Sequence, residues 1–233
     1  MSGAVAVRNA ASVILVRDRA SEPRILMGQR SGRARFMPGV FVFPGGAVDA
    51  ADAEVPLASS IGEPCLGRLH DGADPALATA LQVAAIREVC EETGLLLGRP
   101  GHWPDSPPPG WEAFGENARV PCAGAFRFVF RAITPPGPPR RFDARFFLVD
   151  ADATVPDADL DDFSRAADEL SALHWVRLDD VRELRLAFIT SLALETTLPL
   201  LAHDDSPDSV PCIAGEREQI LRQAHPDSDR FAY

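Results

Sequence analysis

The chain has 233 residues, of which 46% are apolar, and a formal net charge of −11 at pH 7. This length and composition suit a single α/β domain with additions. The negative charge argues against a broad basic surface that binds nucleic acid or an anionic membrane, and no apolar run of about 18 residues predicts a transmembrane helix.

Two strands are predicted near the start of the chain. Residues 11–17 and 24–27 are aliphatic runs joined by a polar segment, which favours a hairpin. Arg30, Arg33 and Arg35 follow in the next loop, and Arg140, Arg141 and Arg145 form a second basic group near a later strand. Either group is a candidate site for an anionic substrate, and a solvated edge of the sheet is an equal alternative.

A third strand, residues 40–43, leads into Pro44-Gly45-Gly46. Glycine permits positive φ and lets the backbone approach a ligand closely. Residues 47–73 contain prolines and glycines without sustained periodicity, and we expect an insertion without regular elements.

A long helix is predicted next, because Asp74 can cap its start, Pro75 suits its first turn and Gly94 is a favoured stop. Its C-terminal half reads Arg87-Glu88-Val89-Cys90-Glu91-Glu92-Thr93-Gly94-Leu95. At about 100° per residue the arginine and the glutamates share one face, and the other side is largely apolar.

The three glutamates of this face predict a metal site. Like charges three or four residues apart on a helix cost a few tenths of a kcal/mol per pair, and a bound cation removes that repulsion. Carboxylate oxygens suit Mg²⁺ or Mn²⁺, and Arg87 can orient Glu91 by an i,i+4 ion pair. For the glutamates alone, a solvated helix face is the alternative.

The remaining elements are predicted from period and turn residues. Residues 98–110 contain five prolines and read as a linker or lid. Residues 126–130 alternate with the period of a half-buried strand, and residues 141–149 are predicted to pair with them. A short strand around His174-Trp175-Val176, helices at 178–184 and 187–201, and a short helix at 214–224 complete the prediction.

Together, the glycine pair and the charged helix resemble the Nudix hydrolase box, whose pattern is G-x5-E-x7-R-E-U-x-E-E-x-G-U with U aliphatic. The segment from Arg87 to Leu95 matches every defined position of the second half. The first half departs from the pattern: the insertion splits the box, and Thr79 stands eight residues before Arg87, where the family usually has glutamate.

The resemblance implies an α/β fold: a Nudix-type α/β/α sandwich with a mixed sheet, an insertion inside the box and a C-terminal helical extension. We expect the domain to span residues 1–202 and a tail to follow at 203–233. The implied activity is that of a pyrophosphohydrolase. Glu88 and Glu92 would hold the metals, with Glu91 and a backbone carbonyl near Gly46 as further ligands.

The general base comes either from the box or from a later loop in this family. Glu169 is the candidate outside the box, and an exposed loop glutamate without a catalytic role is an equal alternative.

The segments around residues 26–31, 36–46 and 141–147 resemble a subgroup with a split box that includes coenzyme A diphosphatases. The implied products are 4′-phosphopantetheine, or its acyl form, and adenosine 3′,5′-bisphosphate. Arg30, Arg33, Arg35 and Arg145 are the candidate contacts for the substrate's phosphates. ADP-ribose or NADH hydrolysis stays open, as does a non-catalytic nucleotide-sensing domain.

The cysteines and the first residues bear on location. Cys65, Cys90, Cys122 and Cys212 include no CxxC pair, which favours reduced thiols over a zinc site. Residues 1–11 do not read as a signal peptide. We expect a cytoplasmic protein with a small-molecule partner, and a homodimer stays open.

Overall fold

The computed structural model describes residues 5–30, 39–167 and 169–215. Within them, the main sheet consists of β1 (Val7–Arg17), β2 (Arg24–Arg30), β3 (Phe41–Val42), β4 (Gly45–Ala47), β7 (Arg127–Ile133), β8 (Arg141–Asp150), β9 (Leu170–Arg177) and β10 (Cys212–Ala214). A separate small sheet pairs β5 (Gly98–Pro100) with β6 (Arg119–Pro121). The helices are α1 (Cys65–His70), α2 (Pro75–Thr93), α3 (Glu112–Glu116), α4 (Ala151–Thr154), α5 (Leu178–Val181) and α6 (Phe188–Thr197), with the 3-10 helices η1 (Ala50–Glu54) and η2 (Leu198–Ala202).

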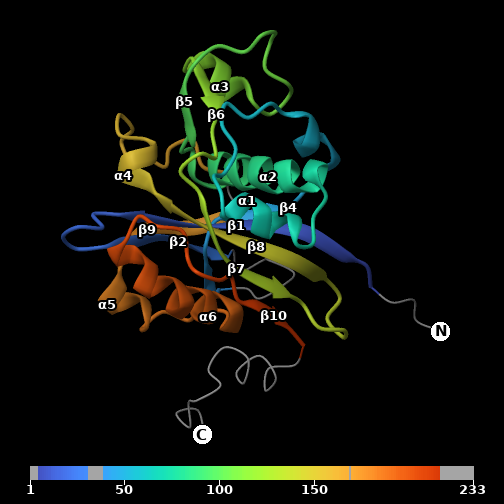
Figure 1. Cartoon of the computed structure of the whole chain (residues 1–233). Helices are drawn as coiled ribbons and strands as arrows, with labels where there is room; N and C mark the ends of the chain where they lie inside the picture. Colours follow the sequence, from blue (N-terminus) through green and yellow to red (C-terminus); the bar gives the residue numbers. More distant parts are fainter. Residues whose placement is uncertain (1–4, 31–38, 168, 216–233) are drawn as a thin grey trace, which may run out of the picture.

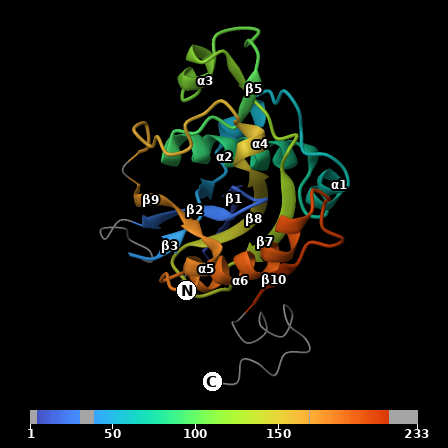
Figure 2. The same ribbon diagram turned by 90° about the vertical axis from the view of Figure 1, so that its left-hand side faces the viewer.

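The main sheet lies between two helical layers. Figures 1 and 2 show α1 and α2 on one face and α5 and α6 on the other, with α3, β5 and β6 beyond α2. β1 runs parallel to β8 and antiparallel to β2 and β4, so the sheet is mixed. The predicted α/β/α sandwich is therefore confirmed.

Side-chain alternation along β1 produces two hydrophobic cores. Val13 and Leu15 belong to the core beneath α2, whereas Ile14 and Val16 belong to the core beneath α6. Successive residues of a strand face opposite sides of a sheet, and a strand covered on both faces reads as a continuous apolar run. This explains why residues 13–16 are all apolar and fully buried.

Both predicted strand pairings are confirmed: β1 pairs antiparallel with β2, and β7 pairs antiparallel with β8. In the second pair the register shifts between Phe128 and Phe130, so Val129 lies at a bulge. The predicted caps of α2 are also confirmed. The Asp74 side chain accepts a hydrogen bond from the Leu77 amide at 2.8 Å, and Gly94 ends the helix with φ of 79°.

Several predicted segments differ from the structure. The insertion contains η1 and α1, and the proline-rich segment expected as a linker begins with β5. The helix expected over 187–201 divides at Thr197, because Pro199 cannot supply the backbone N–H that a continuing α-helix needs.

The C-terminal predictions also change. The helix expected over 178–184 ends at Val181. Ala214, expected in a helix, lies in β10, which runs parallel to β7 and joins this part of the expected tail to the sheet. Residues 216–224 of that expected helix lie outside the described residues. No described helix is long and apolar enough to cross a membrane.

A buried amide attaches the insertion to α2. Gln82 is 1% exposed, and its Oε1 accepts hydrogen bonds from the Ser60 hydroxyl (3.0 Å) and the Ile61 amide (2.7 Å). Its Nε2 donates to the Ala78 carbonyl at 2.9 Å, within the helix. Buried polar groups need partners, so this side chain fixes the loop at Ser60 and Ile61 at one point along α2.

Replacing Gln82→Leu removes the acceptor and leaves the Ile61 amide unsatisfied in the core. We expect the free energy of unfolding to fall by about 1–3 kcal/mol, measured by urea denaturation with the far-UV spectrum of the native state unchanged. A loss below about 0.5 kcal/mol would mean that the insertion finds another acceptor.

Candidate active site

The turn at Gly45 and Gly46 has no room for side chains. A Cβ on Gly45, whose φ is 151°, would lie 2.4 Å from the Ala11 carbonyl oxygen and 2.6 Å from Ser12 Cα. A Cβ on Gly46 would lie 2.4 Å from Oε1 of Glu88. The glycines therefore let β4 pack against β1 on one side while the carboxylate from α2 meets the backbone on the other.

Two glutamates of α2 lie at these glycines: Glu92 is buried and Glu88 is partly buried. Glu92 is 4% exposed and accepts a hydrogen bond from the Gly45 amide at 2.8 Å. Burial raises its pKa to about 8, although the Gly45 hydrogen bond opposes the shift. Burial also raises the pKa of Glu88, against the opposing charge of Arg87. The turn thus concentrates negative charge that the protein itself does not fully compensate.

The Arg87 guanidinium holds the two halves of the box together. Its Nε and Nη2 donate to both carboxylate oxygens of Asp52 in η1, at 2.9 and 3.1 Å. Nη2 also donates to the Ala47 carbonyl at 3.0 Å, and Nη1 donates to Glu88 at 2.8 Å and to Glu91 at 3.3 Å. Burial opposes the charge of Arg87, but the carboxylates outweigh it and raise its pKa.

Asp52 was not predicted from the sequence. It is 2% exposed and stands six residues after Gly46, the spacing that the G-x5-E half of the box requires. Thr79, which stands eight residues before Arg87, instead donates its hydroxyl to the Pro75 carbonyl at 3.1 Å in the first turn of α2. The insertion therefore follows the acidic position of the first half, and counting forward from the glycine would have found it.

Glu88, Glu91 and Glu92 do not form a finished metal site. Among the described residues, no three carboxylate, imidazole or thiolate side chains converge on one point. Arg87 holds Glu88 and Glu91, and the Gly45 amide holds Glu92. The donor set nevertheless fits a hard divalent cation, because it consists of carboxylate oxygens and three carboxylates share one arginine.

Glu169, from the loop before β9, lies near Glu88 and Glu92. Two residues earlier in the chain, the Ala167 amide donates to the Glu91 carbonyl at 2.8 Å, which ties the loop to the last turn of α2. Burial is the largest cause of the raised pKa values of Glu88 and Glu92, and the negative charge of Glu169 adds to the increase in both. The structure thus places Glu169, the candidate general base from outside the box, close to the box glutamates.

Arg30, at the end of β2, is the predicted substrate arginine that lies at the site. The positive charge of Arg30 lowers the pKa of Glu92, but this effect is smaller than the increase that burial causes. Its buried Nε has no hydrogen-bond partner among the described residues. Arg33 and Arg35 lie outside the described residues.

The expected substrate contact by Arg145 is wrong. Its guanidinium is buried in the protein, where it donates to Asn9 Oδ1 (2.7 Å), the Asp143 carbonyl (2.9 Å) and the Gly72 carbonyl (3.0 Å). The residue is 1% exposed, so its charge serves to fasten the end of the insertion to β1 and β8.

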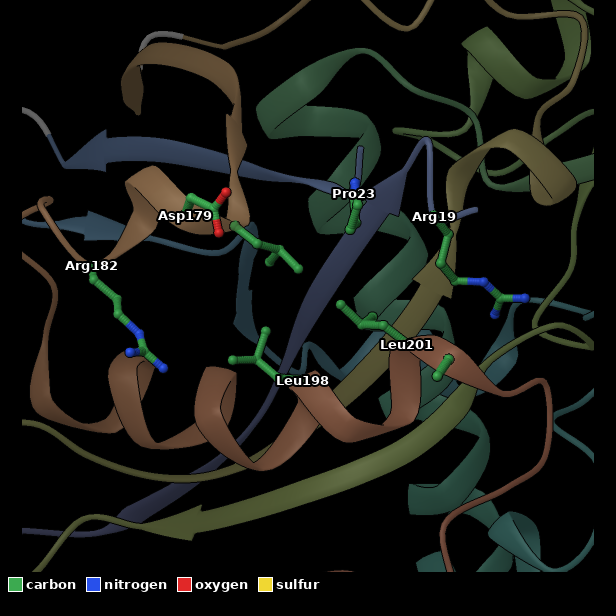
Figure 3. A pocket seen from close by; sticks show the side chains of 8 residues that line it. Arg19, Pro23, Asp179, Arg182, Leu198 and Leu201 are labelled. Carbon is green, nitrogen blue, oxygen red and sulfur yellow. The ribbon is translucent and has the colours of Figure 1, made fainter. Parts of the chain in front are cut away.

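A cavity of about 580 Å³ lies away from the box, between the β1–β2 turn and the layer of α5 and η2 (Figure 3). Leucines and a proline line its centre, and the Arg19 guanidinium points away from it. Arg19 ion-pairs with Asp204 and lies 3.6 Å from Asp150. None of the box residues lines this cavity.

Comparisons with known proteins converge on one family, although no family profile matches the chain. "Putative nudix hydrolase 7" of Caenorhabditis elegans is 29% identical over 180 residues, covering 72% of this chain and 51% of its own length. The acyl-coenzyme A diphosphatase NUDT19 of Homo sapiens is 35% identical over 111 residues, covering 37% of this chain and 30% of its own. This chain therefore spans about half or less of these relatives.

Among solved structures, a NUDIX hydrolase from Alicyclobacillus acidocaldarius superposes with a TM-score of 0.60 at 28% identity. The superposition covers 86% of this chain and 94% of that one, so the likeness extends well beyond the box.

Asp52→Asn tests the ion pair that joins the two halves. The amide keeps the shape of the carboxylate but removes its charge, and we expect a loss of roughly 3 kcal/mol in the free energy of unfolding, as when one partner of a buried pair is removed. Asp49→Asn is the matched control, because Asp49 is exposed and lies 3.9 Å from Arg87. Equal losses in the two variants would contradict the assignment.

Glu92 makes the metal-free protein less stable as pH rises. Its pKa is about 8 in the folded chain against an ordinary value of 4.5, so between these values the unfolded chain has released a proton that the folded chain keeps. The free energy of unfolding should therefore decrease by up to about 1.4 kcal/mol per pH unit within that window. Urea melts in chelator from pH 5 to 8.5 would measure the slope. Glu92→Gln should flatten it, whereas Glu183→Gln should not, and an unchanged slope in Glu92→Gln would refute the cause.

Proposed function

Because the chain belongs to the Nudix hydrolase family, we propose that it hydrolyses the diphosphate linkage of coenzyme A or an acyl-coenzyme A with the help of Mg²⁺ or Mn²⁺. The observation that carries the proposal is the position of the buried Glu92 and the partly buried Glu88 against the Gly45–Gly46 backbone. Their excess negative charge is suited to a divalent cation that also contacts an anionic substrate.

Glu88 and Glu92 are the proposed main metal ligands, with a backbone carbonyl near Gly46. Glu91 would be a further ligand; its hydrogen bond from Arg87, at 3.3 Å, is the longest that Arg87 makes. Bound divalent ions neutralise phosphate charge and make a coordinated water more acidic. The proposed role of Arg87 and Asp52 is to keep the carboxylates in place.

Glu169 is the proposed general base. It is exposed on the loop before β9, and its charge reaches Glu88 and Glu92. In the reaction, a water oxygen bonds to one phosphorus, the anhydride P–O bond breaks, and Glu169 takes the proton from the attacking water. The two phosphate groups then separate as the products.

The choice of coenzyme A rests on relatives rather than on the metal site. Two matched relatives, human and Gallus gallus NUDT19, are named acyl-coenzyme A diphosphatases, with 35% and 37% identity over partial lengths. Arg30 supports an anionic substrate, because its positive charge acts at Glu92 and its Nε has no hydrogen-bond partner within residues 5–30, 39–167 and 169–215. Arg33 and Arg35 remain proposed contacts for the 3′-phosphate.

We further propose that residues 1–202 act as the catalytic domain and that the protein works in the cytoplasm. The four cysteines are free thiols in the structure, in keeping with a reducing compartment.

The test is incubation with coenzyme A and excess Mg²⁺, followed by chromatography with mass detection. We expect 4′-phosphopantetheine and adenosine 3′,5′-bisphosphate, no products in chelator, and no turnover by Glu92→Gln with its fold intact. Glu169→Gln should reduce kcat by roughly 10²- to 10⁴-fold. The exposed Glu183→Gln is the matched control and should retain activity.

Intact coenzyme A would refute this substrate, and ADP-ribose and NADH would then be assayed in the same way. Nucleotide binding that survives Glu92→Gln, without turnover of any of these compounds, would instead indicate a sensing domain.

A further inference from the structure

We propose that Trp175 and Arg17 are positioning residues, which fix the loop of residues 155–167 so that Glu169 is presented at Glu88 and Glu92. The inference rests on the proposed role of Glu169 in hydrolysis. Neither residue belongs to the box, and both lie in strands of the main sheet.

Trp175 makes the central contact with the loop. Its indole N–H donates to the Leu160 carbonyl at 2.7 Å, and the ring belongs to the core beneath α2. A buried indole N–H requires a partner, and here the partner is loop backbone rather than a neighbouring strand. The sheet thereby holds the middle of the loop at a defined position.

Arg17 adds a second attachment beside the first. Its guanidinium carbon lies 4.9 Å from the centroid of the Trp175 ring, and Nη1 lies 2.8 Å from Oδ1 of Asp161. An exposed ion pair alone contributes little. Stacking on the indole restricts the arginine beforehand, so the ion pair holds Asp161 at less entropic cost.

Successive tight turns fix the shape of the rest of the loop. The Ser164 amide donates to Asp162 Oδ1 at 2.9 Å, and the Ala166 amide donates to the Phe163 carbonyl at 3.0 Å. Phe163 also packs against the core beneath α2. Turns closed by side-chain and backbone hydrogen bonds leave few free dihedral angles, so the loop acts as an arm of fixed shape.

The arm ends against the last turn of α2. The Ala167 amide donates to the Glu91 carbonyl at 2.8 Å, and a Cβ on Gly94 would lie 3.0 Å from the Cβ of Arg165. The box glycine thus leaves room for the arm as well as ending the helix. Glu169 lies two residues after Ala167 and directly before Leu170, which pairs with Arg30 of β2, so both of these attachments limit its position.

The experiment uses Trp175→Phe in the full chain, which keeps an aromatic ring and removes the indole donor. Amide hydrogen exchange of peptides covering residues 155–170, measured without substrate, should accelerate. With coenzyme A and Mg²⁺, kcat should fall roughly three- to tenfold with KM little changed. In the Glu169→Gln background the same substitution should cause no further loss.

Trp103→Phe is the matched control, because Trp103 also donates its indole N–H to a carbonyl, that of Arg119, at 3.0 Å, but within the β5–β6 unit. It should leave the exchange of residues 155–170 and kcat unchanged. Arg17→Gln should repeat the effects of Trp175→Phe in smaller size.

Unchanged exchange in Trp175→Phe, or an equal loss of kcat with and without Glu169, would overturn the proposal. If Glu169→Gln itself turns over coenzyme A normally, the proposed base fails instead. The exchange measurement needs no turnover and still decides whether Trp175 holds the arm.

Discussion

The Arg87 guanidinium contacts carboxylates and a carbonyl that are far apart in the sequence. It bonds Asp52 and the Ala47 carbonyl before the insertion, and Glu88 and Glu91 after it. A single planar group with several donors can satisfy such partners together, which a lysine cannot do. The Arg87 guanidinium therefore fixes the position of Glu88 at the Gly46 backbone, and the geometry of the box depends on it.

The arrangement of these carboxylates lowers the stability of the metal-free fold. Glu92 is almost fully buried with one amide donor, and burial makes its charged form costly in the absence of a cation. A fold selected for stability alone would place an apolar side chain beneath this turn. At the proposed metal site, part of the free energy of cation binding would offset this cost.

Predictions from local pattern succeeded where the physical cause was local. The caps of α2, its charged face and the alternating strands need only neighbouring residues, and each was predicted. Asp52 was missed because the spacing was counted across an insertion. Arg145 was misassigned because an arginine's burial depends on partners such as Asn9 and Gly72, far from it in the chain. Likewise, nothing near Glu169 in the sequence indicates that Ala167 bonds the end of α2.

Two arginines fix the chain on the two sides of the insertion. Arg87 binds the segment before it, at Ala47 and Asp52, and Arg145 binds its end at the Gly72 carbonyl. Because both ends are fixed to the sheet and to α2, a change in the length of the chain between them does not move the carboxylates. The entropic cost of closing such a loop grows only slowly with its length. This point in the fold is therefore one where evolution can add or remove residues, and build new contacts to a substrate, without disturbing the catalytic helix.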